Sequence, residues 1–153
     1  MTVLERIIDL LDRGGVDYEK VQHAAVKTSE EAAKIRNTDM SVGAKALVFF
    51  ADEKPILVVV PGDKRVDTQL FKNTFGINDL RFATAKEVLD VTGIEIGAVP
   101  PVGKALNLKS YFDESFKQKE NVAFNAGKHT ISIYMKASDL IKTEEPEFGD
   151  FAR

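Results

Sequence analysis

The sequence predicts one α+β domain that spans residues 1–153. Two observations lead to this prediction. Signatures of helix starts alternate along the chain with short apolar runs typical of strands, and no repeat, linker or change of composition divides the 153 residues. The hydrophobic share of 44% and the charged share of 29% are those of a folded globular protein rather than of a disordered chain.

Charge and composition exclude several classes of protein. With 21 basic and 24 acidic residues the formal net charge is −3, which excludes a strongly basic nucleic-acid coat, and we expect no DNA partner. The absence of cysteine excludes disulfide scaffolds, thiol nucleophiles and cysteine-based zinc sites. No apolar run approaches the ~18 residues of a membrane span. The N-terminal segment carries acids within its apolar pattern, unlike a secretory signal. We therefore expect a cytoplasmic protein without a membrane partner.

Helices are predicted first from capping boxes, in which a hydroxyl and a carboxylate three residues later satisfy the free N–H groups of a helix start. The sequence holds three such pairs, Thr2 with Glu5, Thr28 with Glu31, and Thr84 with Glu87. The first predicted helix has a broad apolar stripe and ends at Gly14 and Gly15, the second is short, and the third ends near Gly93. A further short helix is expected over 68–73, and a helical turn over 138–141.

Strands are predicted from the apolar runs. Residues 46–51 (ALVFFA) and 56–60 (ILVVV) are continuous apolar segments, which indicates strands buried on both faces, and the turn between them predicts a hairpin. The remaining strand segments are shorter, namely 80–82 and the two arms of a second hairpin, 122–125 and 130–135. The acidic tail after Thr143 is expected to be frayed.

Familiar catalytic signatures are missing. The sequence lacks a Gly-x-Ser-x-Gly nucleophile elbow, a Walker loop and a dinucleotide-binding fingerprint. Its two histidines, His23 and His129, are not at a metal-ligand spacing, so we expect no metal site and no cofactor.

Two local features nevertheless suggest chemistry. Lys45 comes directly before five apolar residues, so its ammonium group either reaches back to solvent or faces a partly dry pocket. The segment 97–103 (GAVPPVG) holds two glycines and two prolines. Such a stiff segment is either a loop whose backbone N–H groups approach a ligand closely or an ordinary rigid connection.

These features are part of a longer pattern that resembles the YbaK/prolyl-tRNA synthetase-associated domain family. This family comprises aminoacyl-tRNA editing domains, found free-standing or inserted in prolyl-tRNA synthetase. The matching segments run in family order over 20–141, namely His23 with 28–33 (TSEEAA), 45–49 (KALVF), 61–67 (PGDKRVD), 81–84 (RFAT), 92–93 leading into 97–101 (GAVPP), 111–113 (YFD) and 125–129 (NAGKH). The resemblance implies a mixed, partly barrel-like β-sheet flanked by helices.

The resemblance also implies a hydrolase that cleaves the ester between a wrong amino acid and the terminal ribose of tRNA. Because this ester is already activated, positioning a water molecule and stabilising the developing charge suffice, and no protein nucleophile is needed. Lys45 and Gly97 match the catalytic positions of the family. The resemblance implies that Lys45 is a fixed cation that either holds the terminal adenosine of the substrate or stabilises an oxyanion, and that Gly97 places a backbone group beside the scissile carbonyl. The residues implied in substrate binding are His23, Thr28, Pro100, Pro101, Asp113, Asn125, Gly127 and His129.

Several of these binding residues also have a purely structural interpretation. Asp113 fits the N-cap of a helix that starts at Glu114. His23 fits a hydrogen-bonded histidine that precedes a helix. The remaining alternatives are residues of a hairpin turn, namely Asn125, Gly127 and His129.

We therefore expect a free-standing deacylase that acts in trans on mischarged tRNA in translation quality control. Its partners would be the acceptor end of the tRNA and an aminoacyl-tRNA synthetase, and the resemblance favours alanine or cysteine esters on proline tRNA. Two alternatives remain open, a non-catalytic tRNA- or protein-binding module of the same fold and a hydrolase of small aminoacyl esters. Basic residues gathered around the pocket would favour tRNA over a small ester. The candidates are Lys64, Arg65, Lys104, Lys109, Lys117, Lys119, Lys128 and Lys136.

Overall fold

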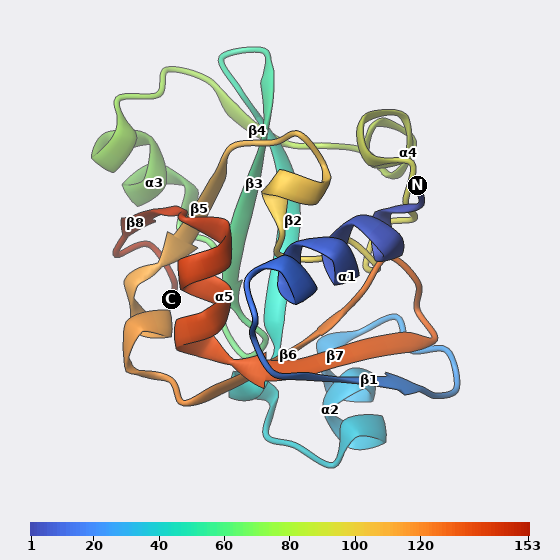
Figure 1. Ribbon diagram of the computed structural model, residues 1–153. Coiled ribbons are helices and arrows are strands. Elements are labelled where there is room, and N and C mark those ends of the chain that lie inside the picture. Colours follow the sequence, from blue (N-terminus) through green and yellow to red (C-terminus); the bar gives the residue numbers. More distant parts are fainter.

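Helices and strands alternate along most of the chain, and the computed structural model describes all of residues 1–153 (Figure 1). The strands are β1 Tyr18–Gln22, β2 Ala44–Ala51, β3 Lys54–Pro61, β4 Leu80–Phe82, β5 Ser110–Asp113, β6 Asn121–Asn125, β7 Ile131–Lys136 and β8 Glu147–Gly149. The α-helices are α1 Val3–Arg13, α2 Ser29–Arg36, α3 Thr68–Phe75, α4 Ala85–Thr92 and α5 Ala137–Glu144. Three short 3-10 helices complete the chain, namely η1 Met40–Val42, η2 Gly103–Ala105 and η3 Glu114–Gln118.

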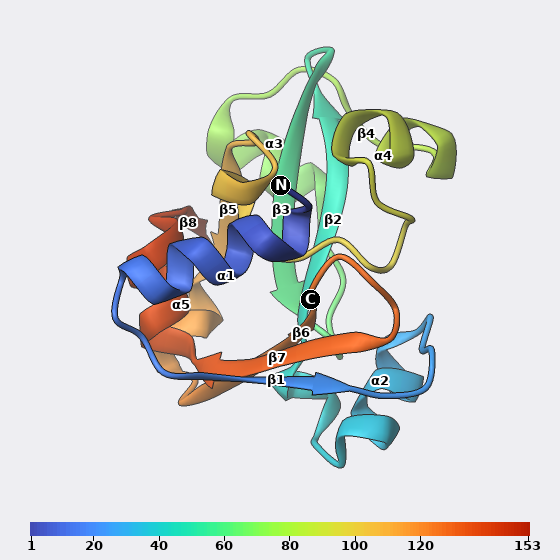
Figure 2. The same ribbon diagram turned by 45° about the vertical axis from the view of Figure 1, so that its right-hand side comes forward.

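The strands form two sheets, where the sequence led us to expect one. A three-stranded sheet has the order β1-β7-β6 and is antiparallel throughout. A five-stranded sheet has the order β4-β2-β3-β5-β8 and is mixed, because β5 runs parallel to both of its neighbours. An isolated parallel bridge between Gly43 and Ala123 joins the two sheets. In Figures 1 and 2 the three-stranded sheet crosses one end of the long β2–β3 hairpin, and α1 lies across the space between them. The predicted α+β class is confirmed.

The apolar run of β3 is buried on both faces of its sheet. Leu57 and Val59 pack into one hydrophobic cluster, whereas Ile56, Val58 and Val60 pack into another. Because side chains alternate across a strand, a strand that is covered on both sides is apolar at every position. The predicted hairpin of β2 and β3 is confirmed, as is the second hairpin, of β6 and β7.

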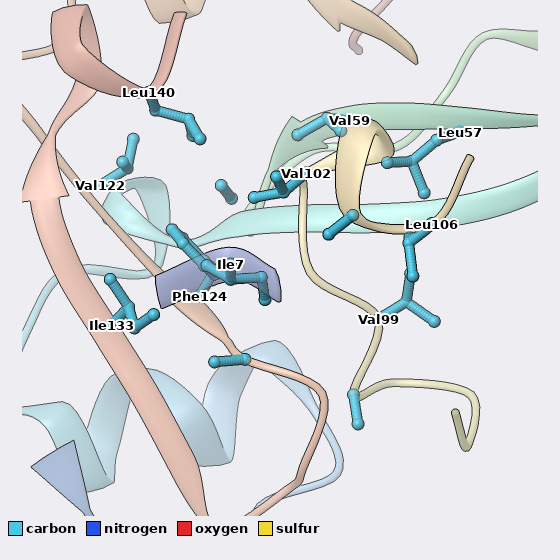
Figure 3. Close-up of a cluster of buried hydrophobic side chains, with 14 of the residues drawn as sticks. Ile7, Leu57, Val59, Val99, Val102, Leu106, Val122, Phe124, Ile133 and Leu140 are labelled. Carbon is cyan, nitrogen blue, oxygen red and sulfur yellow. The ribbon is translucent and has the colours of Figure 1, made fainter. Parts of the chain in front are cut away.

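The larger hydrophobic cluster fills the space between the sheets (Figure 3). Leu57 and Val59 enter it from β3, Phe124 from β6 and Ile133 from β7, and Ile7 of α1 packs against them. Each of these side chains is at most 1% exposed, and burying a side chain of this size contributes roughly 1.5–3 kcal/mol. This core fixes the relative position of the elements that surround the site described below.

Two of the three predicted capping boxes are complete. Thr2 and Thr84 each exchange hydrogen bonds with the glutamate three residues later. Thr28 accepts a hydrogen bond from the backbone N–H of Glu31 at 3.1 Å, but the Glu31 carboxylate binds the Thr28 hydroxyl instead of the Thr28 backbone. α4 ends at Gly93, which has a φ of 74° and therefore suits glycine.

The segment after Thr143 is not frayed, which corrects the prediction from the sequence. α5 continues to Glu144, and β8 then pairs with β5. Phe151 is fully buried, with its ring 4.9 Å from that of Phe71. The acidic residues of the tail point to exposure, but this phenylalanine anchors the tail in the second hydrophobic cluster.

Besides β8 in the tail, two further strands escaped prediction because their sequences carry a weak signal. β1 (YEKVQ) is an edge strand that is mostly exposed, and β5 (SYFD) has only four residues. The expected short helix over 68–73 extends to Phe75, and the expected turn over 138–141 is part of α5. No helix combines the length and the apolar character required to cross a membrane.

Candidate active site

A cavity of about 290 Å³ lies where α2 and β2 meet the loop that follows α4. Residues of α2 and of the first part of β2 line it, together with Ile96 and Gly97 of the loop and Asn125 at the end of β6. Thirteen of its 24 lining residues are hydrophobic. An apolar wall with a few polar groups is the usual composition of a small-molecule site.

The cavity is more positive than the chain as a whole. Its charged lining residues are three cations, Lys27, Arg36 and Lys45, and one acid, Asp39, in a chain of net charge −3. The Asp39 carboxylate accepts a hydrogen bond from the backbone N–H of Ser41 at 2.9 Å, and the hydrogen bonds from this serine lower the pKa of Asp39. This distribution of charge favours an anionic ligand.

Lys45 lies at the second position of β2, and its ammonium group donates a hydrogen bond to the backbone carbonyl of Lys64 at 2.6 Å. Burial is the main cause that lowers the pKa of Lys45, and the charge of Arg65 lowers it further, while Asp63 acts in the opposite direction. A partly desolvated cation interacts strongly with a neighbouring negative charge. Because an ammonium group has three hydrogens, two remain for a ligand.

Gly97 lines the same cavity, in the loop that follows α4. Its φ of 90° is a conformation that favours glycine. A Cβ atom here would lie 3.1 Å from Cε1 of His129 and 3.5 Å from the carbonyl oxygen of Lys27. The Gly97 carbonyl accepts a hydrogen bond from Nδ2 of Asn125 at 3.0 Å, whereas its N–H makes none within the protein. The Gly97 carbonyl is therefore held by a side chain, while its N–H remains a free donor.

Four of the ten predicted site residues line this cavity, namely Lys45, Gly97, Thr28 and Asn125. Both histidines lie behind its wall. His23 places Nε2 2.7 Å from the hydroxyl of Ser132, and His129 places Nδ1 2.8 Å from the carbonyl oxygen of Val26 and Nε2 3.3 Å from the Glu95 carboxylate. The ring of His129 therefore supports Gly97 from behind.

The other four predicted residues do not line the cavity. Pro100 and Pro101 are buried in the continuation of the loop. The backbone N–H of Gly127 donates a hydrogen bond to the carbonyl of Ala98 at 3.0 Å, which ties the β6–β7 turn to the same loop. Asp113 caps η3, as the structural alternative predicted.

Sequence reasoning missed two groups of lining residues. Arg36 ends α2, and no local signal distinguishes it, because a basic residue in the last turn of a helix is ordinary. Phe82 and Ile96 line the cavity although they are 57% and 52% exposed. A large apolar side chain that remains exposed is the kind of feature that marks a binding surface, but the sequence does not reveal exposure.

Comparisons with known proteins show a family and several relatives of this chain. The aminoacyl-tRNA editing domain matches residues 23–143 of the chain. The Escherichia coli (strain K12) protein "Multifunctional Ser/Thr-tRNA deacylase ProXp-y" is 32% identical over 154 residues, which cover 97% of this chain and 92% of that protein. A proline–tRNA ligase of Caldicellulosiruptor saccharolyticus is 31% identical over 125 residues, which cover 82% of this chain and 21% of the ligase. Among solved structures, a candidate trans-editing enzyme for prolyl-tRNA synthetase superposes with a TM-score of 0.85 at 27% identity and covers 100% of this chain and 98% of that one.

Proposed function

We infer, from the premise that this chain belongs to the aminoacyl-tRNA editing domain family, that it is a trans-acting aminoacyl-tRNA deacylase. We propose that it hydrolyses the ester that joins a small amino acid to the terminal ribose of a mischarged tRNA. One observation carries the proposal, which is that a desolvated cation, Lys45, and a free backbone N–H, that of Gly97, belong to the same cavity.

The two donors suit the charge that develops during ester hydrolysis. The oxygen of a water molecule adds to the carbonyl carbon, the carbonyl oxygen becomes negative, and the ribose oxygen then leaves with a proton. We assign the stabilisation of the negative oxygen to the Gly97 N–H and to the free ammonium hydrogens of Lys45. A donor fixed before the reaction is worth more than water, because it does not have to reorient as the charge forms.

The protein offers no general base inside the cavity. Asp39 is its one acid, and the carboxylate of Asp39 is engaged by the N–H of Ser41, while neither histidine belongs to the lining. We therefore assign the orientation of the water to the substrate itself, through its ribose hydroxyl or amino group. An activated ester makes this sufficient, because positioning supplies much of the rate.

The size and lining of the cavity support a small aminoacyl group. A volume of about 290 Å³ is at the lower end of ligand sites, and the hydroxyls of Thr28, Ser29 and Thr38 lie among its lining residues. Hydroxyl groups favour a serine or threonine ester, which agrees with what the Escherichia coli relative acts on by its name. Alanine and cysteine esters on proline tRNA, which the sequence led us to expect, are the second candidates because they fit the same volume.

A hydrolase of small aminoacyl esters remains the alternative, because none of the eight basic residues that were candidates for contacting tRNA lines the cavity. Lys64 and Arg65 adjoin Lys45, but Lys104 and Lys109 form ion pairs with glutamates that follow α5. The part of the substrate that the protein recognises beyond the ester therefore has to be measured.

The deciding experiment measures ester loss from a panel of charged tRNAs. The panel holds proline tRNA that carries alanine or cysteine, non-cognate tRNAs that carry serine or threonine, and the methyl esters of the same four amino acids. We expect hydrolysis of the serine and threonine tRNA esters above the uncatalysed rate, and none of the methyl esters. Equal hydrolysis of methyl esters would favour the small-ester alternative, and no hydrolysis at all would favour a binding module.

Gly97→Val tests whether the loop takes part in catalysis. The branched side chain would meet the ring of His129 and would strain a backbone at a φ of 90°, so deacylation should be abolished while tRNA binding through remote phosphates largely survives. Gly15→Val is the matched control, because Gly15 also has a positive φ, of 65°, but lies at the end of α1 in open space. Equal loss of binding and turnover in Gly97→Val would indicate a misfolded loop instead.

A further inference from the structure

A continuous chain of hydrogen bonds runs behind the cavity wall and ends at the Gly97 loop. Nε2 of His23 lies 2.7 Å from the hydroxyl of Ser132, which accepts a hydrogen bond from Nε of Arg36 at 2.9 Å. Nη2 of Arg36 donates to Oδ1 of Asn125 at 3.0 Å, and Nδ2 of Asn125 donates to the Gly97 carbonyl at 3.0 Å. The hydrogen bonds thus join the residue that follows β1, together with β7, α2 and β6, to the loop.

The direction of each hydrogen bond follows from the chemistry of the groups. Nδ1 of His23 lies 2.8 Å from the carbonyl oxygen of Ala24, and because a carbonyl only accepts, we assign the tautomer in which Nδ1 carries the proton. Nε2 then accepts from the Ser132 hydroxyl, whose oxygen is free to accept from Arg36. Ser132 is fully buried, and in this arrangement its hydroxyl both donates and accepts a hydrogen bond without water.

Arg36 determines which way the amide of Asn125 points. A guanidinium group has donors and no acceptor, so only the amide oxygen of Asn125 can face it. The NH2 group must then face Gly97, where the carbonyl oxygen requires a donor. If the amide were reversed, two pairs of like groups would face each other, and the loop would lose its restraint.

Arg36 is a half-buried arginine without a carboxylate partner. None of the ion pairs of the protein includes it, and both of its hydrogen bonds go to neutral oxygens. Burial lowers the pKa of Arg36, which shows that holding this charge here has an energetic cost. A planar group holds two acceptors in fixed relative directions, whereas the ammonium of a lysine is a compact charge whose donors have no fixed fork geometry.

We propose that Arg36 is a positioning residue that fixes the Asn125 amide and, through it, the Gly97 carbonyl, so that the backbone on both sides of Gly97, including its free N–H, is restrained at the cavity. The effect on catalysis rests on the proposed function of the Gly97 loop, whereas the effect on the loop itself does not.

The first test uses the free protein and needs no substrate. The order parameter of the Gly97 backbone amide, from ¹⁵N relaxation, should be near 0.85 in the parent and fall toward about 0.6 or below in Arg36→Met and in Asn125→Asp. An aspartate at 125 still accepts from Arg36 but has no donor for the Gly97 carbonyl. Lys34→Met is the matched control, because Lys34 is an exposed cation on the same helix. Unchanged mobility of Gly97 in both variants overturns the proposal.

The second test uses the kinetics of deacylation. Arg36→Met should lower kcat by up to about 10²-fold, which is what a misplacement near 1 Å costs, while KM changes by less than about threefold. Arg36→Lys should recover only a small part of the loss. If Arg36 acts through Asn125, the kcat of the double variant R36M/N125D should be no lower than that of the less active single variant.

Two outcomes of the kinetics would overturn the proposal. A rise in KM at unchanged kcat would show that Arg36 binds the substrate directly, through the Nη1 group that has no partner in the protein. Multiplying losses in the double variant would show that the two residues act independently. If the parent protein deacylates nothing, the proposed function fails, and the order parameter of Gly97 still decides the role of Arg36.

Discussion

The cavity around Lys45 and the C-terminal region around Asp113 both hold a charge away from water, and the same resemblance singled out both residues. The ammonium of Lys45 makes one hydrogen bond, to a backbone carbonyl, and borders a cavity. The carboxylate of Asp113 is in a residue that is 4% exposed, and it accepts three hydrogen bonds at 2.9–3.1 Å. Their donors are the backbone N–H groups of Ser115, Phe151 and Ala152.

The two pKa shifts report this difference. Burial dominates at Lys45 and lowers its pKa, so the protein replaces only part of the water that the charge has lost. Burial alone would raise the pKa of Asp113, but the hydrogen bonds from Ser115, Ala152 and Phe151 together outweigh it and lower that pKa. A charge that the protein fully satisfies stabilises the fold, whereas an incompletely satisfied charge beside a cavity is available to a ligand.

Replacing Lys45 should have the largest effect. Lys45→Ala is expected to lower the rate of deacylation by about 10²–10³, which is the usual cost of removing one positioned electrostatic donor. The free energy of unfolding should change by less than about 1 kcal/mol, because no core volume is removed. Single-turnover deacylation and urea unfolding measure the two effects.

Lys45→Arg sharpens this result, because the charge remains while its shape and reach change. We expect a large loss here as well. Lys54→Ala is the matched control, since Lys54 is an exposed cation at the other end of the same hairpin. A folded Lys45→Ala protein that deacylates at the parent rate would remove Lys45 from the proposed site.

Replacing Asp113 should have the opposite signature. Asp113→Ala leaves three backbone N–H groups without their acceptor and removes the cap of η3, so we expect a loss of about 2–4 kcal/mol in the free energy of unfolding. The rate of deacylation by the protein that remains folded should stay within about twofold of the parent. Glu114→Ala, at the exposed neighbouring position, is the control for stability. A large loss of kcat with an unchanged free energy of unfolding would show that Asp113 also acts in catalysis.

The fold could be predicted where one segment carries the signal by itself. The apolar runs of β2 and β3 predicted their hairpin, and the threonine–glutamate pairs predicted the helix starts, because both patterns are local. The tail could not be predicted in this way. Its order depends on Phe151, which packs against residues more than sixty positions earlier in the chain, such as Phe71.

The site residues likewise divide into those with a local sequence signal and those that depend on distant partners. Lys45 before an apolar run and Gly97 in a glycine–proline segment are local features, and both lie at the cavity. The contribution of Arg36 is not local, because its partners Ser132 and Asn125 are about ninety residues away in sequence. Asp113 shows the converse limit, since a segment can match a family pattern and still contain a residue whose hydrogen bonds serve the fold.

The smallest effect that we predict is the pH dependence of the stabilisation that the Asp113 carboxylate gives to the folded state. The pKa of Asp113 is lowered in the folded state from its ordinary value of 3.8. As the pH falls below this value, the unfolded chain therefore takes up the proton first, and the folded state loses its advantage. Above it, the contribution of the charge is fully present and constant.

Asp113→Asn has the same shape but cannot titrate, and its NH2 group cannot accept a hydrogen bond. The gap in unfolding free energy between parent and Asp113→Asn should therefore be constant from pH 7 to about pH 5 and then narrow as the pH falls toward and through the lowered pKa. Urea unfolding of both proteins at several pH values measures the gap. A gap that widens on acidification would mean that the folded state raises the pKa of Asp113, and the contrast drawn with Lys45 would then fail.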